Sequence, residues 1–593
     1  EFPFGGRRYR FNDKGEFESA QPIEADEKFW SDIERKDGTK DAAFDYDGAK
    51  NFLEHRGYWR HEKPNHEYEF VHVDGQIVSE VKPHQIADYI KQFAQDTLPK
   101  YVRNMLHRGA TQYFGPVSLS MLGYFSEPFD RPAFGTERLF FRNTIWEITA
   151  DHIKSIPYTS LGFFIWGNQR KDFEVSELPE LIRIHEEDGI WSYTITHEGK
   201  KCNFLQFLEN TSNFTWRKDR AEITEQDRRE NAQHLVSKLS ALGYLVATAK
   251  SKSVSKAVIG MDGKQSEVGT SNGRSGKSLL GEAARQVVTT RYKNGKEFSG
   301  GKMPSFVWDG VDERTRLVFL DDVQKDFDFE SLFSLITGDW PVNPKGEREF
   351  VLPWERSPKI YLTTNHATTG DGASFEDRQW LIAFSDYYNA THKPIHDFGT
   401  HFFSDEWPSE QWNSYWNLVA TCLRIFFRYG YVAAPGDRLE KRKLLQDVGE
   451  EFVQWADEYY SPATEAGKVS NLNRVDIPRK VIYDNFLEYI GPARRTFYNP
   501  RNFKTKLLKY CELRGYIFNP QIFDPARKVY VGKPNDDGVP SKDIKRNGTE
   551  YFTIGTEDYY KSEPQIFTET PGGAGDTTSY VPAFQVDDND IPY

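Results

Sequence analysis

The sequence predicts an α/β protein organised around a parallel sheet with flanking helices. Apolar runs of strand length alternate with helical patterns from residue 256 to about residue 431, which is the order that a parallel sheet with crossover helices requires. A loop of small residues leads into the helical run that begins near Leu279. Two later strands, 317–320 and 359–364, end directly at acidic or amide side chains. Because strand ends of this kind lie opposite the loop, we expect a functional site there.

Composition restricts the class of protein. The chain has 593 residues, enough for about three or four domains, with 28% charged and 15% aromatic residues, as in a folded globular protein. It has no apolar stretch of about eighteen residues and opens with no signal peptide, so we expect a soluble, cytoplasmic protein without a membrane partner. The formal charge of -13 argues against a wholly basic nucleic-acid coat but allows a locally basic channel. Cys202, Cys422 and Cys511 are too scattered for a zinc ribbon or a disulfide framework.

Changes of pattern divide the chain into four predicted regions. An Asp74-Gly75 turn between two strand-like runs marks the first region as mixed α+β. The run Ala433-Ala434-Pro435-Gly436-Asp437 marks a boundary, beyond which two helical patterns precede a strand pair at 516–519 and 528–531. The regions are a mixed α+β N-terminal accessory domain (1–234), the domain of the predicted parallel sheet (235–432), a winged-helix-like domain (440–560) and a disordered acidic tail (561–593).

The segment Ser271-Asn272-Gly273-Arg274-Ser275-Gly276-Lys277-Ser278 is typical of a loop that binds nucleotide phosphates. Small residues let backbone N–H groups point at a polyphosphate, the lysine reaches the terminal phosphates, and the serine hydroxyl can bind Mg²⁺. Ser271 stands where the usual pattern has its first glycine, so a surface turn is the alternative for this motif by itself. The predicted nucleotide-binding residues are Gly273, Arg274, Ser275, Gly276, Lys277, Ser278 and Leu279.

Two strand ends supply the other half of a hydrolytic site. The strand 317–320 runs into Asp321-Asp322, and hydrolysis needs one carboxylate beside Mg²⁺ and another that orients the attacking water. A strand that merely enters an acidic turn is the alternative, which the upstream phosphate loop disfavours. Asn365 ends the next strand, where an amide can contact the γ-phosphate and its water. Arg378 follows and can reach the nucleotide of a neighbouring subunit, with Arg356 as a rival for that role.

A turn-rich segment with isolated basic residues lies between these two strands. It runs from Thr337 to Arg348 and includes Lys345. We interpret it as a hairpin that projects into a central pore.

The order of these motifs resembles that of the superfamily 3 helicases. That family has a glycine-lysine-serine loop, a double aspartate, a lysine-bearing hairpin, an asparagine sensor and an arginine finger in this order. The stretch from about Leu242 to Tyr431 is similar to the helicase half of phage, plasmid and poxvirus-type primase-helicases. The segments that carry the likeness are Gly273-Arg274-Ser275-Gly276-Lys277-Ser278-Leu279-Leu280, Ser357-Pro358-Lys359-Ile360-Tyr361-Leu362-Thr363-Thr364-Asn365 and Phe375-Glu376-Asp377-Arg378.

The resemblance implies an AAA+-like ATPase core and a ring hexamer that hydrolyses ATP with Mg²⁺ at its subunit interfaces while moving on single-stranded DNA. It assigns phosphate binding to Lys277, Mg²⁺ to Ser278 and Asp321, the attacking water to Asp322, the γ-phosphate to Asn365, the adjacent subunit's ATP to Arg378, and DNA to Lys345 with Arg348 beside it. The absent glycine at Ser271 leaves the detailed geometry of the loop open.

The third region carries a local excess of basic residues. Within residues 494–514, seven cations are opposed by the single acid Glu512; they are Arg494, Arg495, Arg501, Lys504, Lys506, Lys509 and Arg514. In a winged-helix arrangement the second helix can lie against phosphates, so Arg501 and Lys504 are candidate DNA-binding residues. A merely solvated basic face is an equal alternative.

Three further patterns have simpler interpretations. Asp45 and Asp47 resemble a two-metal carboxylate pair, but Gly48 follows at once and favours an exposed acidic turn. The histidines between His61 and His72 have spacings that suit no common metal site. The acidic end, 587–593, resembles the tip of bacterial single-strand-binding proteins and is a candidate for binding host replication proteins, with an arbitrary acidic tail as the alternative.

The sequence therefore predicts an ATP-dependent replicative DNA helicase from a phage or another mobile element. Because the first residue is Glu1, we expect any linked primase to lie upstream of it or on another chain. One alternative is a regulatory or defence ATPase whose nucleotide state controls partner binding. Another is an origin-binding or loading protein led by the basic C-terminal region.

Overall fold

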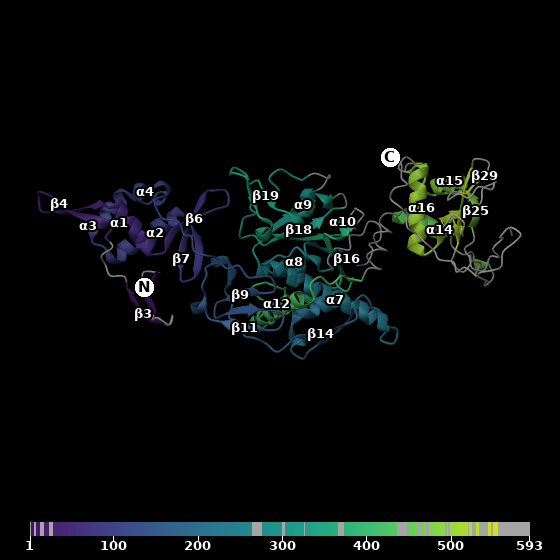
Figure 1. The fold of residues 1–593 in the computed structure, drawn as a ribbon, viewed down its shortest axis with the longest axis horizontal. Coiled ribbons are helices and arrows are strands. Elements are labelled where there is room, and N and C mark those ends of the chain that lie inside the picture. Colours follow the sequence, from purple (N-terminus) through teal and green to yellow (C-terminus); the bar gives the residue numbers. More distant parts are fainter. Residues whose placement is uncertain are drawn as a thin grey trace. The chain divides into compact units, whose positions relative to one another are not determined.

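The computed structural model contains two compact units, Glu1–Gln446 and Asp447–Tyr593 (Figure 1). It describes residues 2–4, 7–11, 17–22, 28–263, 275–298, 303–324, 327–365, 373–435, 448–460, 464–465, 468–469, 474–492, 495, 498–519, 521–524, 529–532, 544–546 and 549–555. Ser271, Gly273, Arg274 and the predicted tail 561–593 lie outside these residues. Every described helix is too short or too polar to cross a membrane.

The first unit opens with two small antiparallel sheets and a group of helices. An Asp74-Gly75 turn joins β7 to β8, as predicted, with Asp74 paired to Ile77. Two helices follow, α2 and α3, which Pro99 separates as the N-cap of the second. The elements are β1 (Phe2–Phe4), β2 (Arg7–Phe11), β3 (Phe17–Pro22), β4 (Trp30–Glu34), β5 (Lys40–Phe44), α1 (Tyr46–His55), β6 (Tyr58–Glu62), β7 (Tyr68–Asp74), β8 (Ile77–Val81), α2 (Pro83–Thr97), α3 (Lys100–Arg108), α4 (Ala110–Tyr113) and α5 (Pro116–Leu119).

A second β-rich segment leads to two helices of the main core. Its four-stranded sheet has the order β11-β10-β9-β13, β14 and β15 form a hairpin, and β12 pairs with β8. The elements are β9 (Glu137–Phe141), β10 (Ile145–Ile148), β11 (Ile153–Ile156), η1 (Tyr158–Ser160), β12 (Ile165–Trp166), η2 (Gly167–Gln169), β13 (Arg170–Lys171), β14 (Ile182–Glu187), β15 (Ile190–Ile195), η3 (Gly199–Lys201), α6 (Asn203–Ser212) and α7 (Glu225–Val246).

The predicted parallel sheet is the centre of the first unit. It has five strands in the order β17-β18-β21-β16-β22, and every neighbouring pair is parallel. Strands β16 and β21 are buried on both faces, as in parallel sheets generally, whereas the edge strand β17 is partly exposed. The elements are β16 (Ala257–Asp262), α8 (Lys277–Val287), β17 (Thr290–Asn294), η4 (Gly295–Phe298), β18 (Leu317–Val323), η5 (Phe329–Leu332), α9 (Phe333–Thr337), β19 (Trp340–Val342), β20 (Phe350–Leu352), η6 (Trp354–Arg356), β21 (Lys359–Thr364), α10 (Ala373–Glu376), β22 (Gln379–Phe384), α11 (Pro394–Phe398) and α12 (Ser409–Tyr429).

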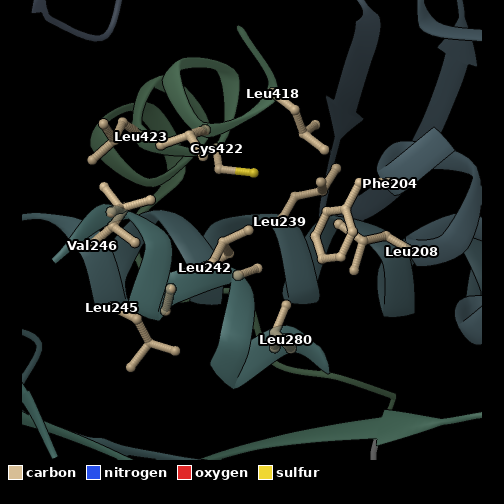
Figure 2. Packing of buried hydrophobic residues seen from close by; sticks show 14 of the residues in the cluster. Phe204, Leu208, Leu239, Leu242, Leu245, Val246, Leu280, Leu418, Cys422 and Leu423 are labelled. Carbon is tan, nitrogen blue, oxygen red and sulfur yellow. The ribbon is translucent and has the colours of Figure 1, made fainter. Parts of the chain in front are cut away.

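Helices α7 and α12 pack against each other beside this sheet (Figure 2). Leu239, Leu242 and Val246 of α7 face Leu418 and Cys422 of α12, and the same cluster takes in residues of α6 and α8. The contact requires glycine at one point, because a Cβ on Gly243 would lie 2.1 Å from the carbonyl oxygen of Cys422. Helix α7 thus continues across the predicted boundary between residues 234 and 235, since its whole buried face belongs to this core.

The second unit is a small α+β structure. Its main sheet has the order β25-β30-β26, with β29 paired to β30. The strand pair predicted from 516–519 and 528–531 is wrong: β26 pairs with β30, and β28 forms a separate hairpin with β27. The elements are α14 (Glu450–Tyr460), β23 (Thr464–Glu465), β24 (Lys468–Val469), β25 (Arg474–Pro478), α15 (Arg479–Ile490), α16 (Pro500–Arg514), β26 (Ile517–Phe518), β27 (Gln521–Asp524), β28 (Val529–Gly532), β29 (Ile544–Arg546) and β30 (Thr549–Gly555).

Candidate nucleotide site

The N-terminus of α8 lies at the carboxyl edge of the central sheet. The residue before the helix, Gly276, has φ +100°, and a Cβ there would lie 2.5 Å from the Phe207 ring, so both backbone conformation and space require glycine. The Tyr361 hydroxyl donates to the Lys277 carbonyl oxygen at 2.7 Å. Burial raises the pKa of Tyr361 well above its usual value, which keeps this phenol protonated. The start of α8 is therefore held firmly against β21.

The side chain of Lys277 contacts two acceptors on neighbouring strands. Its Nζ lies 2.5 Å from Asp262 Oδ1 at the end of β16 and 2.8 Å from Asn365 Oδ1 just after β21. The Ser275 hydroxyl also donates to Asp262. Asn365, predicted as a site residue, thus lies beside the lysine. Asp262 was missed, although it ends the strand before the phosphate loop, which is the same kind of position that pointed to Asp321.

Asp321 lies against the second residue of α8. The Ser278 hydroxyl donates to Asp321 Oδ1 at 2.7 Å, and the Thr363 hydroxyl donates to the same oxygen at 2.6 Å. The Tyr292 hydroxyl donates to Asp321 Oδ2 at 3.3 Å, and burial together with this carboxylate raises the pKa of Tyr292. A serine hydroxyl beside one carboxylate is a donor set that fits Mg²⁺, which keeps several ligands from water and phosphate. No cluster of three or more His, Cys, Asp or Glu side chains suited to a metal occurs in the part of the chain that the structure describes.

Asp322 has an unusual backbone conformation. Its φ is +61°, and the pairing of β18 with β21 shifts register between Leu320 and Val323. The Asp322 N–H donates to the Thr363 hydroxyl at 2.9 Å, and Lys296 Nζ lies 3.2 Å from Asp322 Oδ2. Such strain at a site is kept only where the surroundings impose it. The two adjacent carboxylates border the same cavity but have different partners, Ser278 and Thr363 for Asp321 and Lys296 for Asp322.

These groups border one cavity of about 580 Å³. This size is within the range of small-molecule sites. Its residues on the loop and strand ends are Ser275, Gly276, Lys277, Ser278, Leu279, Asp321, Asp322, Thr363 and Asn365. Its opposite wall is formed by Lys393, Pro394, Ile395, Thr400, His401 and Phe402, none of which was predicted. No spacing in the sequence identifies this wall, because it depends on where the chain returns after β22.

The arginine candidates lie apart from the lining residues. Arg378 immediately precedes β22, and its guanidinium lies 4.8 Å from the centre of the Phe333 ring. Arg356 is exposed at the end of η6. Neither belongs to the described residues that border the cavity.

The predicted hairpin is formed by β19 and β20, with Lys345 and Arg348 exposed in its loop. The backbone N–H of Lys345 donates to Asp309 Oδ1 at 3.2 Å. Glu347 in the same loop lies 3.3 Å from Lys63 Nζ. The side chains of Lys345 and Arg348 thus extend from a loop that is held at two other points.

The two basic candidates on α16 have different surroundings. Arg501 is exposed in the first turn of the helix. Lys504 Nζ lies 2.7 Å from Glu550 Oε1, and Arg479 pairs with the same carboxylate. The charge of Lys504 is therefore opposed within the fold, which reduces what it can offer to a phosphate.

The simpler interpretations of two N-terminal patterns agree with the geometry. Asp45 is exposed, and its side chain accepts from the Gly48 N–H at 3.1 Å as the N-cap of α1. His66 Nδ1 lies 3.1 Å from Glu62, and His61 Nε2 lies 3.1 Å from Glu313. These side chains have structural partners.

No family model matches the chain, and no curated protein matches it. Among solved structures, the chain is similar to two A-form apo structures of the NrS-1 C-terminal region. One shares 13% identity over 79% of this chain and 87% of that chain, and the other shares 12% over 86% and 98%; both have a TM-score of 0.31. A structure of JCV helicase with a bound thiazolopyridine compound shares 13% identity over 43% of this chain and 65% of that chain, with a TM-score of 0.21. These low values carry no argument about activity.

Proposed function

We propose that the chain is an ATP-dependent replicative DNA helicase whose ATP and Mg²⁺ bind in the cavity at the carboxyl edge of the central sheet. One observation carries the proposal: Lys277, Ser278, Asp321, Asp322 and Asn365 are far apart in the sequence and border the same cavity. A surface turn and an unrelated acidic turn would have no reason to meet in this way. The parallel sheet brings three strand ends and one helix N-terminus together at the place where such folds bind phosphates.

Each of these side chains has a role that follows from its chemistry. Lys277 donates to the terminal phosphates, and the N-terminus of α8 adds its partial positive charge. Ser278 and Asp321 would hold Mg²⁺, which would neutralise charge on the phosphates. Asp322 accepts a hydrogen bond from the attacking water, and Asn365 donates to the γ-phosphate. The Thr363 hydroxyl keeps the two aspartates in their separate orientations.

The proposal includes a homo-oligomer, as a ring hexamer. Arg378 would stabilise the transition state in a neighbouring subunit, and Arg356 is the rival for that role. Single-stranded DNA would contact the exposed Lys345 and Arg348 of the β19–β20 loop. A phage or mobile-element origin, a linked primase, and binding of host replication proteins by the acidic end rest on the sequence resemblance alone.

The decisive experiment measures ATP hydrolysis by the whole chain with and without single-stranded DNA, together with strand displacement on a forked duplex. The proposal requires stimulation by single-stranded DNA and displacement that depends on ATP. Hydrolysis that does not respond to DNA would instead favour the regulatory or defence ATPase. Sequence-specific duplex binding without displacement would favour the origin-binding protein.

The role of Arg378 has its own test. Arg378→Ala should abolish turnover while nucleotide binding and assembly persist, because a finger acts on the neighbour's nucleotide. Arg356→Ala is the matched control and should retain turnover. Near-normal turnover in Arg378→Ala together with its loss in Arg356→Ala would move the finger to Arg356.

A further inference from the structure

Asp262 and Lys277 form a buried ion pair behind the proposed phosphate site. The side chains are 6% and 9% exposed, and Asp262 Oδ1 lies 2.5 Å from Lys277 Nζ. Lys277 borders the cavity, whereas Asp262 is not among its described lining residues. The ammonium group therefore lies between the carboxylate and the space where the phosphates would bind.

The backbone of Asp262 is held in place by the strand pairing of β16. Asp262 is the last residue of β16 and pairs with Phe384 of β22, and the next N–H, that of Gly263, donates to the Phe384 carbonyl oxygen at 2.8 Å. A Cβ on Gly263 would lie 2.1 Å from the Phe214 ring, so the chain is closely packed at this point. Lys277 has a flexible stem, whereas the backbone of Asp262 is paired with β22 and the Ser275 hydroxyl donates to the Asp262 carboxylate.

The ion pair stabilises the buried ammonium of Lys277 in the nucleotide-free protein. A buried ammonium without a counter-ion is costly, and Asp262 and Asn365 supply its acceptors before a phosphate arrives. The same arrangement acts against a polyanion. An ammonium directs its hydrogens tetrahedrally, so a phosphate oxygen that shares Lys277 with Asp262 would lie only about 4.5 Å from the carboxylate.

We propose that Asp262 is a built-in counter-charge that lowers the affinity of this site for nucleotide phosphates and so favours their release. The inference rests on the proposed nucleotide site and concerns how tightly that site binds. It predicts the direction of the effect: removing the negative charge of Asp262 strengthens binding of any ligand that places phosphates at Lys277. A purely structural role predicts the opposite, because loosening Lys277 would weaken binding.

The test is Asp262→Asn in the full chain, which keeps the side chain's shape and its acceptor oxygen. Dissociation constants would be measured by calorimetry for a non-hydrolysable ATP analogue, ADP and inorganic tripolyphosphate, each with Mg²⁺. Binding of all three should tighten at least about fivefold, the effect of removing one unit charge at that separation even at the dielectric constant of bulk water. Tripolyphosphate isolates the charge effect because it has no base or sugar.

Asp130→Asn is the matched control. Asp130 is another buried carboxylate in an ion pair, 2.7 Å from Arg138 Nη1, and it is not part of the cavity. This variant should leave all three dissociation constants unchanged. Asp262→Ser provides a second neutral variant if Asp262→Asn does not fold.

The outcomes are distinct. Unchanged or weaker binding in a variant that unfolds as cooperatively as the wild type overturns the role of Asp262 while the nucleotide site stands. A wild-type chain that binds none of the three ligands overturns the proposed function itself, and the inference with it. Equal tightening in Asp130→Asn would also overturn the inference, because it would show a general response to lost negative charge.

Discussion

Lys277 at the central sheet and two cations on α16 all pair with carboxylates, but their surroundings differ. Lys277 lies between two strand ends, and its acceptors Asp262 and Asn365 leave it bordering a cavity with further acids and hydroxyls around it. On α16, Lys504 pairs with Glu550 of β30, and Arg514 pairs with Asp457 of α14. The cavity and the polar groups around Lys277, rather than its charge alone, therefore point to a ligand.

The largest expected effect comes from comparing substitutions of two lysines, Lys277 and Lys504. Lys277→Ala should lower ATP hydrolysis by about 10²–10³-fold or more, because it removes a charged donor from the terminal phosphates. Lys504→Ala should leave hydrolysis within about twofold, since its partner is a structural carboxylate. Steady-state assays at saturating ATP measure both. An equal loss in the two variants would contradict the distinction between the regions.

The site can be tested more finely at Thr363, whose hydroxyl bonds to both aspartates. Thr363→Val should lower kcat about 10–100-fold with little change in KM. The substitution removes the hydrogen bonds to the Asp321 carboxylate and the Asp322 N–H, which hold the two aspartates in place, but it removes no phosphate donor. Thr363→Ser keeps the hydroxyl and is the matched control. If Val and Ser behave alike, Thr363 does not position the aspartates.

The structural role of the α16 cations predicts a loss of stability. Glu550 has a side chain that is 11% exposed and pairs with both Arg479 and Lys504. Glu550→Gln should lower the free energy of unfolding of the second unit by about 1–3 kcal/mol, because it leaves two cations with one neutral acceptor. Urea unfolding, followed by a probe in that unit, measures the change, and ATP hydrolysis should stay the same. A more stable variant would show that the two cations do not need this carboxylate.

The last test concerns Lys359, a buried lysine of the central region that is not among the described residues bordering the nucleotide-site cavity. Burial lowers the pKa of Lys359 to about 7, and its Nζ donates to the Tyr244 carbonyl oxygen at 2.7 Å and to that of Ala247. The unfolded chain keeps the usual lysine pKa, so above pH 7 it binds more protons than the folded chain, and stability rises with pH toward 10. Urea midpoints at pH 7, 8 and 9 should therefore increase.

Lys359→Met should make that increase smaller. Lys250, whose pKa burial also lowers to about 7, acts in the same direction and should maintain part of it. An unchanged pH dependence in Lys359→Met would show that Lys359 is charged in the folded protein.

Local patterns predicted the central region well, since strands buried on both faces and the glycine turn before α8 leave strong signals. Lys277, Ser278, Asp321, Asp322 and Asn365 were predicted and do meet at one cavity. The pairing of β26 was predicted wrongly because its partner, β30, is the last of the described strands rather than the next one. Nearest-neighbour pairing is the default expectation from sequence, and here a later strand displaced it.

The sequence by itself determined the parallel sheet, the start of α8 and the polar residues at the strand ends, because each depends on residues close together in the chain. Only the tertiary structure decided which of these polar side chains contact one another. The order β17-β18-β21-β16-β22 places Asp262 beside Lys277 and Thr363 beside both aspartates, and the return of the chain after β22 supplies the wall from Lys393 to Phe402. The same applies to Lys504, whose charge is opposed by a strand that follows it by many residues. Contacts across a sheet depend on strand order, and strand order is set by the packing of the whole unit rather than by any one segment.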